Sequence, residues 1–451
     1  MAWNVIIAGG GFAGANCARE LEKLLPKQSA RLSLVNDVNF VLYTPFLPEA
    51  AAGLLEPRHV VTPLREILNR TYLRLGAVVG HDPASRTVEI RSHEGETETA
   101  RYDQLVVSVG SVSRSLPVPG LAENAIGFKS LADAIWLRNH VVETLELANA
   151  AEDARRRERL LTYVFVGGGY AGLEALAELQ DFAADAMDRY PRARLHGMRW
   201  ILVEATDRVL PEIDQSLADY AVRELRGRGI EVRLGTTIEE VTPESTTLST
   251  GETVATRTVV WTAGVRPQPS LRHLALPLDD GGRIKVDDHL RVEGMDGVWA
   301  MGDCAAVPDP SGGLAPPTAQ HGIRQARVVA RNVSASLSGD EAPRRYEYSS
   351  RTAFVNLGRY KAVGRIGGRT FSGFLAWWMA RSYHLSQIPG LFRKIRAVID
   401  WTVSLPFKRD TAEVGSIGHP KPLRDEEYEA GGSHRPLPAR DEPHEGVETP
   451  A

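Results

Sequence analysis

Two glycine-rich loops with the same spacing are the residues of this sequence whose types most directly indicate chemistry. They read Gly9-Gly-Gly-Phe-Ala-Gly14 and Gly167-Gly-Gly-Tyr-Ala-Gly172. In this pattern the first glycine permits a tight turn, the second lets a pyrophosphate approach the backbone, and the third lets a helix pack closely on a strand. The helix N-terminus offers free N–H groups and a partial positive charge to phosphates. One such loop is weak evidence, but two predict two dinucleotide sites, built on Gly9, Gly11 and Gly14 and on Gly167, Gly169 and Gly172.

A polar residue after the second strand of each unit is expected to bind a ribose. In the second unit Glu204 directly follows the apolar run 200–203. A carboxylate at this position favours NADH, because it would repel the extra phosphate of NADPH; Arg208 nearby weakens that preference. In the first unit the position holds Asn36, with Asp37 next. An asparagine can still hydrogen-bond a hydroxyl, so both residues are counted as cofactor contacts.

The elements around the two loops repeat as well. A β-rich apolar run precedes each loop, and a helix-forming stretch and a second apolar run follow it. The helix-forming stretches are expected to begin near Ala15 and Leu173. The runs are 3–8 and 31–35 in the first unit and 161–166 and 199–203 in the second. This order predicts an α/β fold with two doubly wound, Rossmann-like dinucleotide-binding domains. Residues 138–160, rich in Glu, Ala and Arg, are expected to form one bridging helix.

Two further strand-like runs end in turns of small residues. Residues 104–109 run into a turn of small residues from Ser108 to Gly110. Residues 258–261 are followed by a similar turn that ends at Gly264. Such turns let the chain leave one nucleotide domain and enter the next. We therefore count Ser108, Gly110 and Gly264 among the cofactor-binding residues.

Composition excludes several classes of protein. A chain of 451 residues is too long for one ordinary core and predicts two or three domains. The net charge of −4 argues against a nucleic-acid binder. The two cysteines, Cys17 and Cys304, form no CxxC pair, and the histidines show no HExxH spacing, so we expect no disulfide framework and no metal.

We expect no secretory signal, and no apolar run reaches the ~18 residues of a spanning helix, so any membrane contact should be peripheral.

The C-terminal part changes character. Apolar residues recur at helical spacing on one face of two consecutive stretches: Phe371, Phe374, Leu375, Trp378 and Met379, then Phe392, Ile395, Ile399 and Val403. Basic residues at 393, 394 and 396 occupy other faces. Such amphipathic helices suit an anionic bilayer surface, although a helix packed on its own domain or on a dimer partner shows the same pattern. Residues 421–451 are poor in apolar residues and are predicted to form a disordered tail.

Four motifs together resemble a known family. The paired glycine loops, Tyr43-Thr-Pro-Phe-Leu-Pro-Glu49, Gly302-Asp303 and Pro316-Pro-Thr-Ala-Gln320 are similar to those of type II NADH dehydrogenases, the single-subunit NADH:quinone oxidoreductases. The resemblance covers roughly residues 3–410. It implies FAD in the first unit, NADH in the second, a quinone acceptor and a C-terminal membrane-binding segment.

The resemblance also implies roles for single residues. Gly302 and Asp303 would meet the ribityl–phosphate region of the flavin, and Thr44 and Pro45 would lie along its isoalloxazine ring. Glu174 would lie near the nicotinamide.

On the quinone side, Gln320 would hydrogen-bond a quinone carbonyl as the first glutamine of the family's AQxAxQ motif. That motif departs from the family here, because Gly322 replaces its middle alanine and Arg324 its last glutamine.

The resemblance implies this organisation: FAD-binding domain at 1–115 and 281–340, NADH-binding domain at 116–280, membrane-associating segment at 341–418 and disordered tail at 419–451. We expect a respiratory-chain flavoprotein that passes hydride from NADH to FAD and two electrons to quinone without pumping protons, peripheral on the cytoplasmic face of the cell membrane. Arg324 keeps open an NADH-dependent flavin reductase with a soluble or protein acceptor. A flavin-binding redox sensor is a third hypothesis, and a homodimer is left open.

Overall fold

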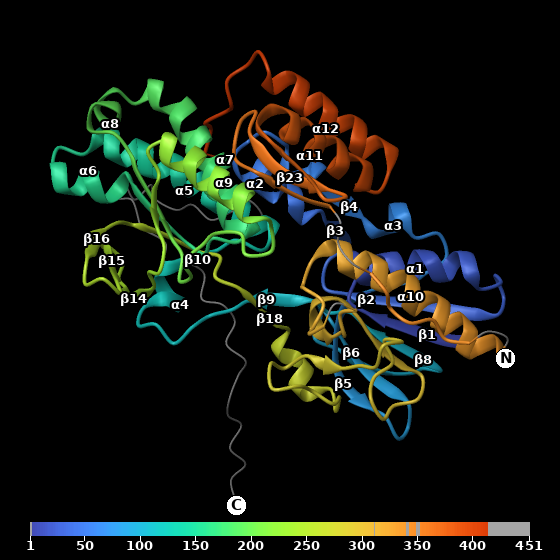
Figure 1. Ribbon diagram of the computed structural model, residues 1–451. Helices are drawn as coiled ribbons and strands as arrows, with labels where there is room; N and C mark the ends of the chain where they lie inside the picture. Colours follow the sequence, from blue (N-terminus) through green and yellow to red (C-terminus); the bar gives the residue numbers. More distant parts are fainter. Residues whose placement is uncertain (1, 311, 340–341, 349–351, 414–451) are drawn as a thin grey trace, which may run out of the picture.

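The computed structural model describes residues 2–310, 312–339, 342–348 and 352–413, so the predicted tail at 419–451 lies outside the described residues. Two sheets with parallel cores organise the chain, one in each half of the molecule (Figure 1). The α/β fold with parallel sheets is therefore confirmed. Among the described residues, no helix combines the length and apolar composition that crossing a bilayer requires.

The first sheet has the strand order β20-β8-β1-β2-β5-β6-β7. Its first five strands run parallel, and β6 and β7 extend it as an antiparallel hairpin. The central strand β8 is buried throughout and β1 is buried from Val5 to Ala8, as expected where helices cover both faces. The strand bounds are β1 Trp3–Ala8, β2 Ala30–Asn36, β5 Tyr72–Asp82, β6 Thr87–Ser92, β7 Thr97–Arg101, β8 Gln104–Val107 and β20 Val298–Ala300.

The second sheet has the order β10-β17-β11-β12-β13, with every pair parallel. The chain enters it after β8 and later returns to the first sheet at β20 (Figure 1). The antiparallel pair β9–β18 joins the outgoing and returning segments between the two sheets. The bounds are β9 Ser111–Ser113, β10 Ala125–Gly127, β11 Thr162–Val166, β12 Arg199–Val203, β13 Glu231–Arg233, β17 Thr258–Trp261 and β18 Val265–Pro267.

The helices that follow the glycine loops are α1 (Phe12–Leu24) and α7 (Tyr170–Ala186). They begin directly after Gly11 and Gly169, earlier than the expected starts at Ala15 and Leu173. Both glycines have the extended backbone of an N-cap, so the chain turns into the helix at once. Helix α1 packs along α10 (Ala319–Ser338) with a face of small residues.

The expectation of one bridging helix at 138–160 was wrong. The segment belongs to two helices, α5 (Leu131–Ala150) and α6 (Ala154–Leu160). Ser130 and Asp133 form a capping box at the start of α5, and the side chain of Asp153 caps α6. The second cap lets the chain turn inside a stretch whose composition is helical throughout.

The remaining elements are short, apart from α9. The short helices are α2 Leu47–Ala51, α3 Leu64–Ile67, α4 Leu121–Asn124 and α8 Pro191–His196, whereas α9 spans Gln215–Gly227. Small antiparallel sheets pair β3 Phe40–Leu42 with β4 Val61–Pro63, and β14 Ile238–Val241, β15 Ser245–Leu248 and β16 Thr253–Ala255 with one another; β19 Ile284–Lys285 and β21 Ala305–Ala306 pair in parallel.

The C-terminal part folds back over the junction of the two halves (Figure 1). A three-stranded antiparallel sheet, β22 (Thr352–Asn356), β23 (Ala362–Ile366) and β24 (Arg369–Ser372), leads into α11 (Gly373–Gln387) and α12 (Leu391–Ser404). The sheet contacts α7 and α9 of the second unit.

One buried ion pair ties α11 and α12 to α2. Arg381 lies between two indole rings, with its guanidinium carbon 4.2 Å from the ring centre of Trp377 and 4.7 Å from that of Trp401. Its Nη2 is 3.3 Å from Oε1 of Glu49, and Trp401 Nε1 donates a hydrogen bond of 2.6 Å to Oε2 of the same carboxylate. Glu49 is 1% exposed, so its charge is compensated by these groups rather than by water.

We predict that Arg381→Met destabilises the protein by about 3–5 kcal/mol, because it leaves Glu49 as an unpaired buried carboxylate. Urea unfolding followed by tryptophan fluorescence measures the effect. The matched control is Arg396→Met, an exposed arginine on α12, which should change stability by less than ~0.5 kcal/mol. Equal effects of the two substitutions would contradict the assigned role of the ion pair.

Candidate functional site

A cavity of about 330 Å³ opens at the first glycine loop, at the carboxyl ends of β1, β2 and β8. The structure gathers there most of the residues predicted to hold FAD: Gly9, Gly11, Asn36, Asp37, Thr44, Ser108, Gly110, Gly302 and Asp303. Gly14 and Pro45, also predicted, do not line the cavity. The N-terminal end of α10 reaches it through Thr318 and Ala319, so two helix N-termini face one space.

The glycines of the loop differ in what surrounds them. Gly9 has φ +99°, a conformation that glycine adopts without strain. A Cβ on Gly14 would lie 1.8 Å from the carbonyl oxygen of Gly9, so this residue must be glycine for α1 to pack on the loop. A Cβ on Gly11 would meet nothing within 4 Å. The second glycine therefore faces open space that a phosphate could fill, and the residues around it suit the pyrophosphate of a dinucleotide cofactor.

The second unit repeats these contacts. Gly167 has φ +111°, and a Cβ on Gly172 would lie 2.0 Å from its carbonyl oxygen. Gly169 faces open space, as Gly11 does.

The predicted ribose residues also hold their own loops in place. Oδ1 of Asn36 accepts a hydrogen bond of 2.7 Å from the backbone N–H of Gly10, and Oε2 of Glu204 accepts one of 2.6 Å from Gly168. A Cβ on either glycine would lie 2.9 Å from an atom of that side chain. Sequence reasoning missed Gly10 and Gly168, although their identical position in both loops was a visible signal.

A hydroxyl ties each glycine loop to the turn after the neighbouring strand. Ser108 Oγ donates to the carbonyl of Gly9 at 3.0 Å, and Thr262 Oγ1 donates to the carbonyl of Gly167 at 3.2 Å. Thr262 was not predicted as a site residue. Both turns then pass through left-handed glycines, Gly110 and Gly264.

Glu204 and Arg208 have separate partners. Oε1 of Glu204 accepts hydrogen bonds of 2.8 Å from the backbone N–H and the hydroxyl of Thr206. Arg208 Nη2 donates to the carbonyls of Leu210, at 3.3 Å, and Ile213, at 2.7 Å. The guanidinium is thus engaged with backbone carbonyls rather than with Glu204.

Asp303 belongs to a chain of polar contacts at the cavity. Its Oδ2 accepts a hydrogen bond of 2.6 Å from Ser111 Oγ, which accepts one of 2.8 Å from Lys129 Nζ. Lys129 Nζ and Asp303 Oδ2 are 3.7 Å apart. Burial lowers the pKa of Lys129, and the nearby carboxylate opposes that shift. Sequence reasoning named neither Ser111 nor Lys129, since nothing local marks them.

Gln320 lies beside the cavity and is positioned by its neighbours. Its Nε2 donates to the carbonyl of Thr352 at 3.2 Å, and Tyr348 donates its hydroxyl to Oε1 at 3.4 Å. Arg324, one turn further along α10, is exposed and lies over the ring of Tyr348, 5.1 Å from its centre. The unusual arginine therefore sits on the outer side of the Gln320 position.

Glu174 is buried on α7 rather than exposed at the second loop. Its Oε1 accepts a hydrogen bond of 2.8 Å from the backbone N–H of Asn356 on β22. Burial raises its pKa to about 8; the bond from Asn356 lowers it, and Glu178 and Glu49 raise it further. At neutral pH this carboxyl group holds its proton.

Glu178 lies one turn further along α7 and is also fully buried. Burial raises its pKa to about 7, against the attraction of Arg409, whose Nη2 is 3.8 Å from Oε2 of Glu178. Glu49, Glu174 and Glu178 thus form a buried carboxylate cluster where α2, α7 and the C-terminal part meet. The spacing of Glu174 and Glu178 in an otherwise Ala- and Leu-rich helix was the available signal for it.

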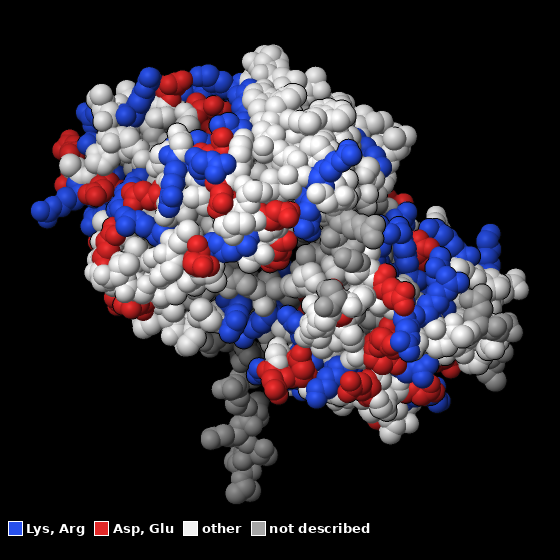
Figure 2. All heavy atoms as spheres, in the orientation of Figure 1, with Lys and Arg blue, Asp and Glu red and all other residues white. Residues whose placement is uncertain are grey.

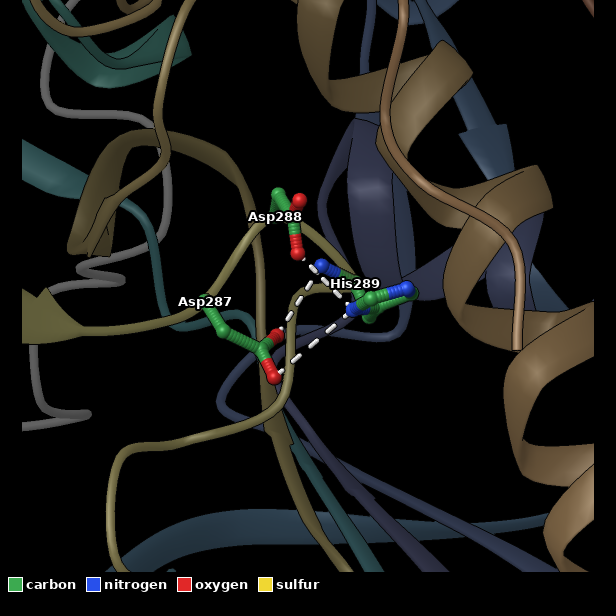
Figure 3. A group of neighbouring side chains, drawn as sticks. All are labelled: Asp287, Asp288 and His289. Carbon is green, nitrogen blue, oxygen red and sulfur yellow. Dashed lines mark hydrogen bonds and ion pairs between the residues drawn. The ribbon is translucent and has the colours of Figure 1, made fainter.

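Asp287, Asp288 and His289 bring two carboxylates and an imidazole together (Figure 3). Oδ1 of Asp287 accepts bonds of 2.9 Å from the backbone N–H groups of His289 and Arg291. Asp288 binds His289 Nδ1 at 2.8 Å and Arg345 Nε at 3.1 Å. These oxygens already stabilise a turn, so the group carries no metal assignment.

Comparisons with known proteins agree with this geometry. The pyridine nucleotide-disulphide oxidoreductase family matches residues 3–328. The chain is 30% identical over 414 residues to a probable NADH dehydrogenase of Dictyostelium discoideum, covering 90% of each chain. It is also 30% identical over 414 residues to the type II NADH:quinone oxidoreductase Ndh of Mycobacterium tuberculosis, covering 89% of this chain and 87% of the relative. NDH2 of Plasmodium falciparum, solved in complex with NADH, has the same fold, with a TM-score of 0.83 at 16% identity, covering 91% of this chain and 100% of that one.

We predict that Gly14→Ala lowers stability by about 1–3 kcal/mol, because its Cβ overlaps the backbone of Gly9 and forces the loop to move. Thermal unfolding and the flavin absorbance of the purified protein measure the effect. Gly11→Ala is the matched control. Its backbone suits alanine and its Cβ meets no atom, so it should fold normally while retaining less flavin. Normal stability of Gly14→Ala would refute the packing argument.

Glu174 should make stability fall as pH rises. Its pKa is about 8 in the folded protein against an ordinary 4.5, so between these values the folded state keeps a proton that the unfolded chain has lost. Glu174→Gln cannot ionise and should reduce the loss of unfolding free energy between pH 5 and pH 8, measured by urea unfolding. Glu178 still contributes, so the loss is reduced rather than abolished. The exposed Glu239→Gln should leave it unchanged; a wild-type pH profile for Glu174→Gln would contradict the assignment.

Proposed function

Since the chain belongs to the type II NADH:quinone oxidoreductase family, within the pyridine nucleotide-disulphide oxidoreductases, we propose that it passes two electrons from NADH to a membrane quinone through bound FAD. The observation that carries the proposal is the pair of matching glycine loops, one of which opens on a cavity next to Asp303 and the N-terminus of α10. When bound, FAD accepts hydride and releases electrons to the acceptor. The polypeptide binds, orients and separates the two substrates.

The first loop holds the FAD pyrophosphate at the N-terminus of α1. Gly9 and Gly14 shape the loop, and Gly11 leaves room for the phosphates. Asp303 and Thr44, which both line the cavity, would hold the ribityl region and the ring.

The second loop binds NADH, with Glu204 on the ribose hydroxyls. Its carboxylate repels the additional phosphate of NADPH, and the guanidinium of Arg208 is directed to backbone carbonyls instead. Glu174 supports the nicotinamide end from its buried position, and its protonated state avoids a negative charge beneath the second loop.

The amide of Gln320 serves the quinone, whose carbonyl it hydrogen-bonds, while Thr352 and Tyr348 set the orientation of that amide.

The C-terminal helices form the membrane contact. Every apolar residue that was predicted on α12, and three of those predicted on α11, are well exposed: Phe374 62%, Leu375 54%, Trp378 57%, Phe392 78%, Ile395 46%, Ile399 53% and Val403 52%. Figure 2 shows a broad, largely uncharged surface in the region of α11 and α12. Aromatic and aliphatic side chains of this kind, with Arg393, Lys394 and Arg396 around them, fit the interface of an anionic bilayer. The proposal therefore includes peripheral attachment, on the cytoplasmic face of the membrane.

The proposal predicts that NADH bleaches the flavin band near 450 nm anaerobically and that quinone restores it. The acceptor is tested in two forms: a water-soluble short-chain naphthoquinone and a long-chain menaquinone in vesicles of anionic phospholipid. Phe392→Ser combined with Ile399→Ser should leave the first rate unchanged and lower the second at least tenfold, because only the second requires docking. The control, Leu195→Ser, removes an apolar side chain that is 90% exposed on α8 and should change neither rate.

Failure of NADH to bleach the flavin would refute the whole proposal. Bleaching that neither quinone reverses would instead support a soluble or protein acceptor, the function that Arg324 on the outer side of Gln320 would then serve.

A further inference from the structure

Lys129 extends from the second unit into the cavity of the first and has no role in the function above. We propose that Lys129 holds a positive charge beside the flavin ring and stabilises the negative charge that the ring gains on reduction, raising its midpoint potential. The inference rests on the proposal that the cavity holds FAD.

The backbone of Lys129 is fixed by the start of α5. Its N–H and that of Ser130 each donate a hydrogen bond of 2.9 Å to Oδ2 of Asp133, within the capping box. Lys129 follows β10, the edge strand of the second sheet. A rigid helix cap therefore sets the point from which the side chain reaches the cavity.

Two contacts direct the ammonium group. Ser111 Oγ accepts a hydrogen bond of 2.8 Å from Nζ. The same hydroxyl donates a hydrogen bond of 2.6 Å to Oδ2 of Asp303. An ammonium group carries three N–H donors. Ser111 accepts one and the carboxylate of Asp303 attracts a second, which leaves the third for a ligand. The side chain is 37% exposed, and because it lines the cavity, a cofactor would cover part of that surface.

The charge balance of the cavity favours a role in charge stabilisation. Among the described residues that line it, Lys129 is the one cation, beside the carboxylates of Asp37 and Asp303. Asp37 stands with Asn36 at the predicted ribose end, whereas Lys129 stands with Asp303 at the ribityl end. Asp303, 3.7 Å away, helps the lysine to keep its proton.

The phosphates have another partner, the N-terminus of α1 at the glycine loop. With the pyrophosphate assigned to that helix end, the inference assigns the ammonium group of Lys129 to the ring. The N-terminus of α10 also faces the cavity and contributes a partial positive charge there. It is unaffected by replacing Lys129, so the substitution removes only the positive charge of the lysine.

The test replaces Lys129 by Met and by Arg and measures two properties of the bound flavin at saturating FAD. The first is its midpoint potential against reference dyes. The second is its affinity for sulfite, whose lone pair bonds to N5 of the oxidised ring and displaces an electron pair that remains on the ring as negative charge. Lys129→Met should raise the ratio of oxidised to reduced flavin at a given potential at least tenfold, which lowers the midpoint potential by about 30 mV for a two-electron couple. It should also weaken sulfite binding at least tenfold.

Lys129→Arg keeps the cation and should restore most of both values. The control, Lys23→Met, removes an exposed lysine that pairs with Glu20 on α1 and should change neither. Unchanged potential and sulfite affinity in Lys129→Met would overturn the inference, as would a variant whose only defect is weaker FAD binding, because the lysine would then merely hold the cofactor. Wild-type protein that binds no FAD would refute the proposed function instead, and the two failures are thereby distinguishable.

Discussion

A helix that approaches its preceding strand too closely to admit a Cβ atom is the constraint on which the rest of this structure depends. It occurs twice, at Gly14 and at Gly172, where the added atom would lie within about 2 Å of a carbonyl oxygen of the same loop. The close approach aims the N–H groups of the first helical turn at the end of the sheet. With Gly11 and Gly169 facing open space, phosphates can reach those groups, and both predicted nucleotide sites follow from that one packing requirement.

The same constraint explains why the residues predicted to bind the riboses also have a structural task. A loop drawn tightly onto a helix still needs its exposed N–H groups satisfied, and Asn36 and Glu204 satisfy the middle glycine from the next strand. An asparagine and a glutamate do this equally well, because both present an acceptor oxygen. The side chain that fixes the loop is therefore also the one predicted to bind the ribose, and the asparagine in place of an acidic residue in the first unit still fixes its loop.

Charge burial couples the distant parts of the chain. Glu49, in the segment that follows Thr44, is compensated by Arg381 and Trp401 of the C-terminal helices. Because Arg381 and Trp401 point toward the buried Glu49, that side of α11 and α12 is packed inward. Apolar residues on the rest of the two helices, such as Trp378 and Phe392, are exposed to solvent. Among the described residues, Glu174 has no cation of its own in the buried carboxylate cluster, and its proton takes the place of one. The exposed apolar surface of α11 and α12 and the segment after Thr44 are thus parts of one packed unit.

The sequence by itself determined what depends on neighbours in the chain. The glycine spacing and the apolar runs were enough to predict two parallel units, and the helical spacing of residues such as Phe392 and Ile399 predicted a helix where α12 lies. Local composition could not show that Asp153 would divide 138–160 into two helices, since a cap competes with a helix-forming stretch by only about 1 kcal/mol. Tertiary structure alone decided the burial of Glu174 and the meeting of Lys129, Ser111 and Asp303. Those contacts join residues up to 192 positions apart, and only the order in which strands enter the two sheets brings them together.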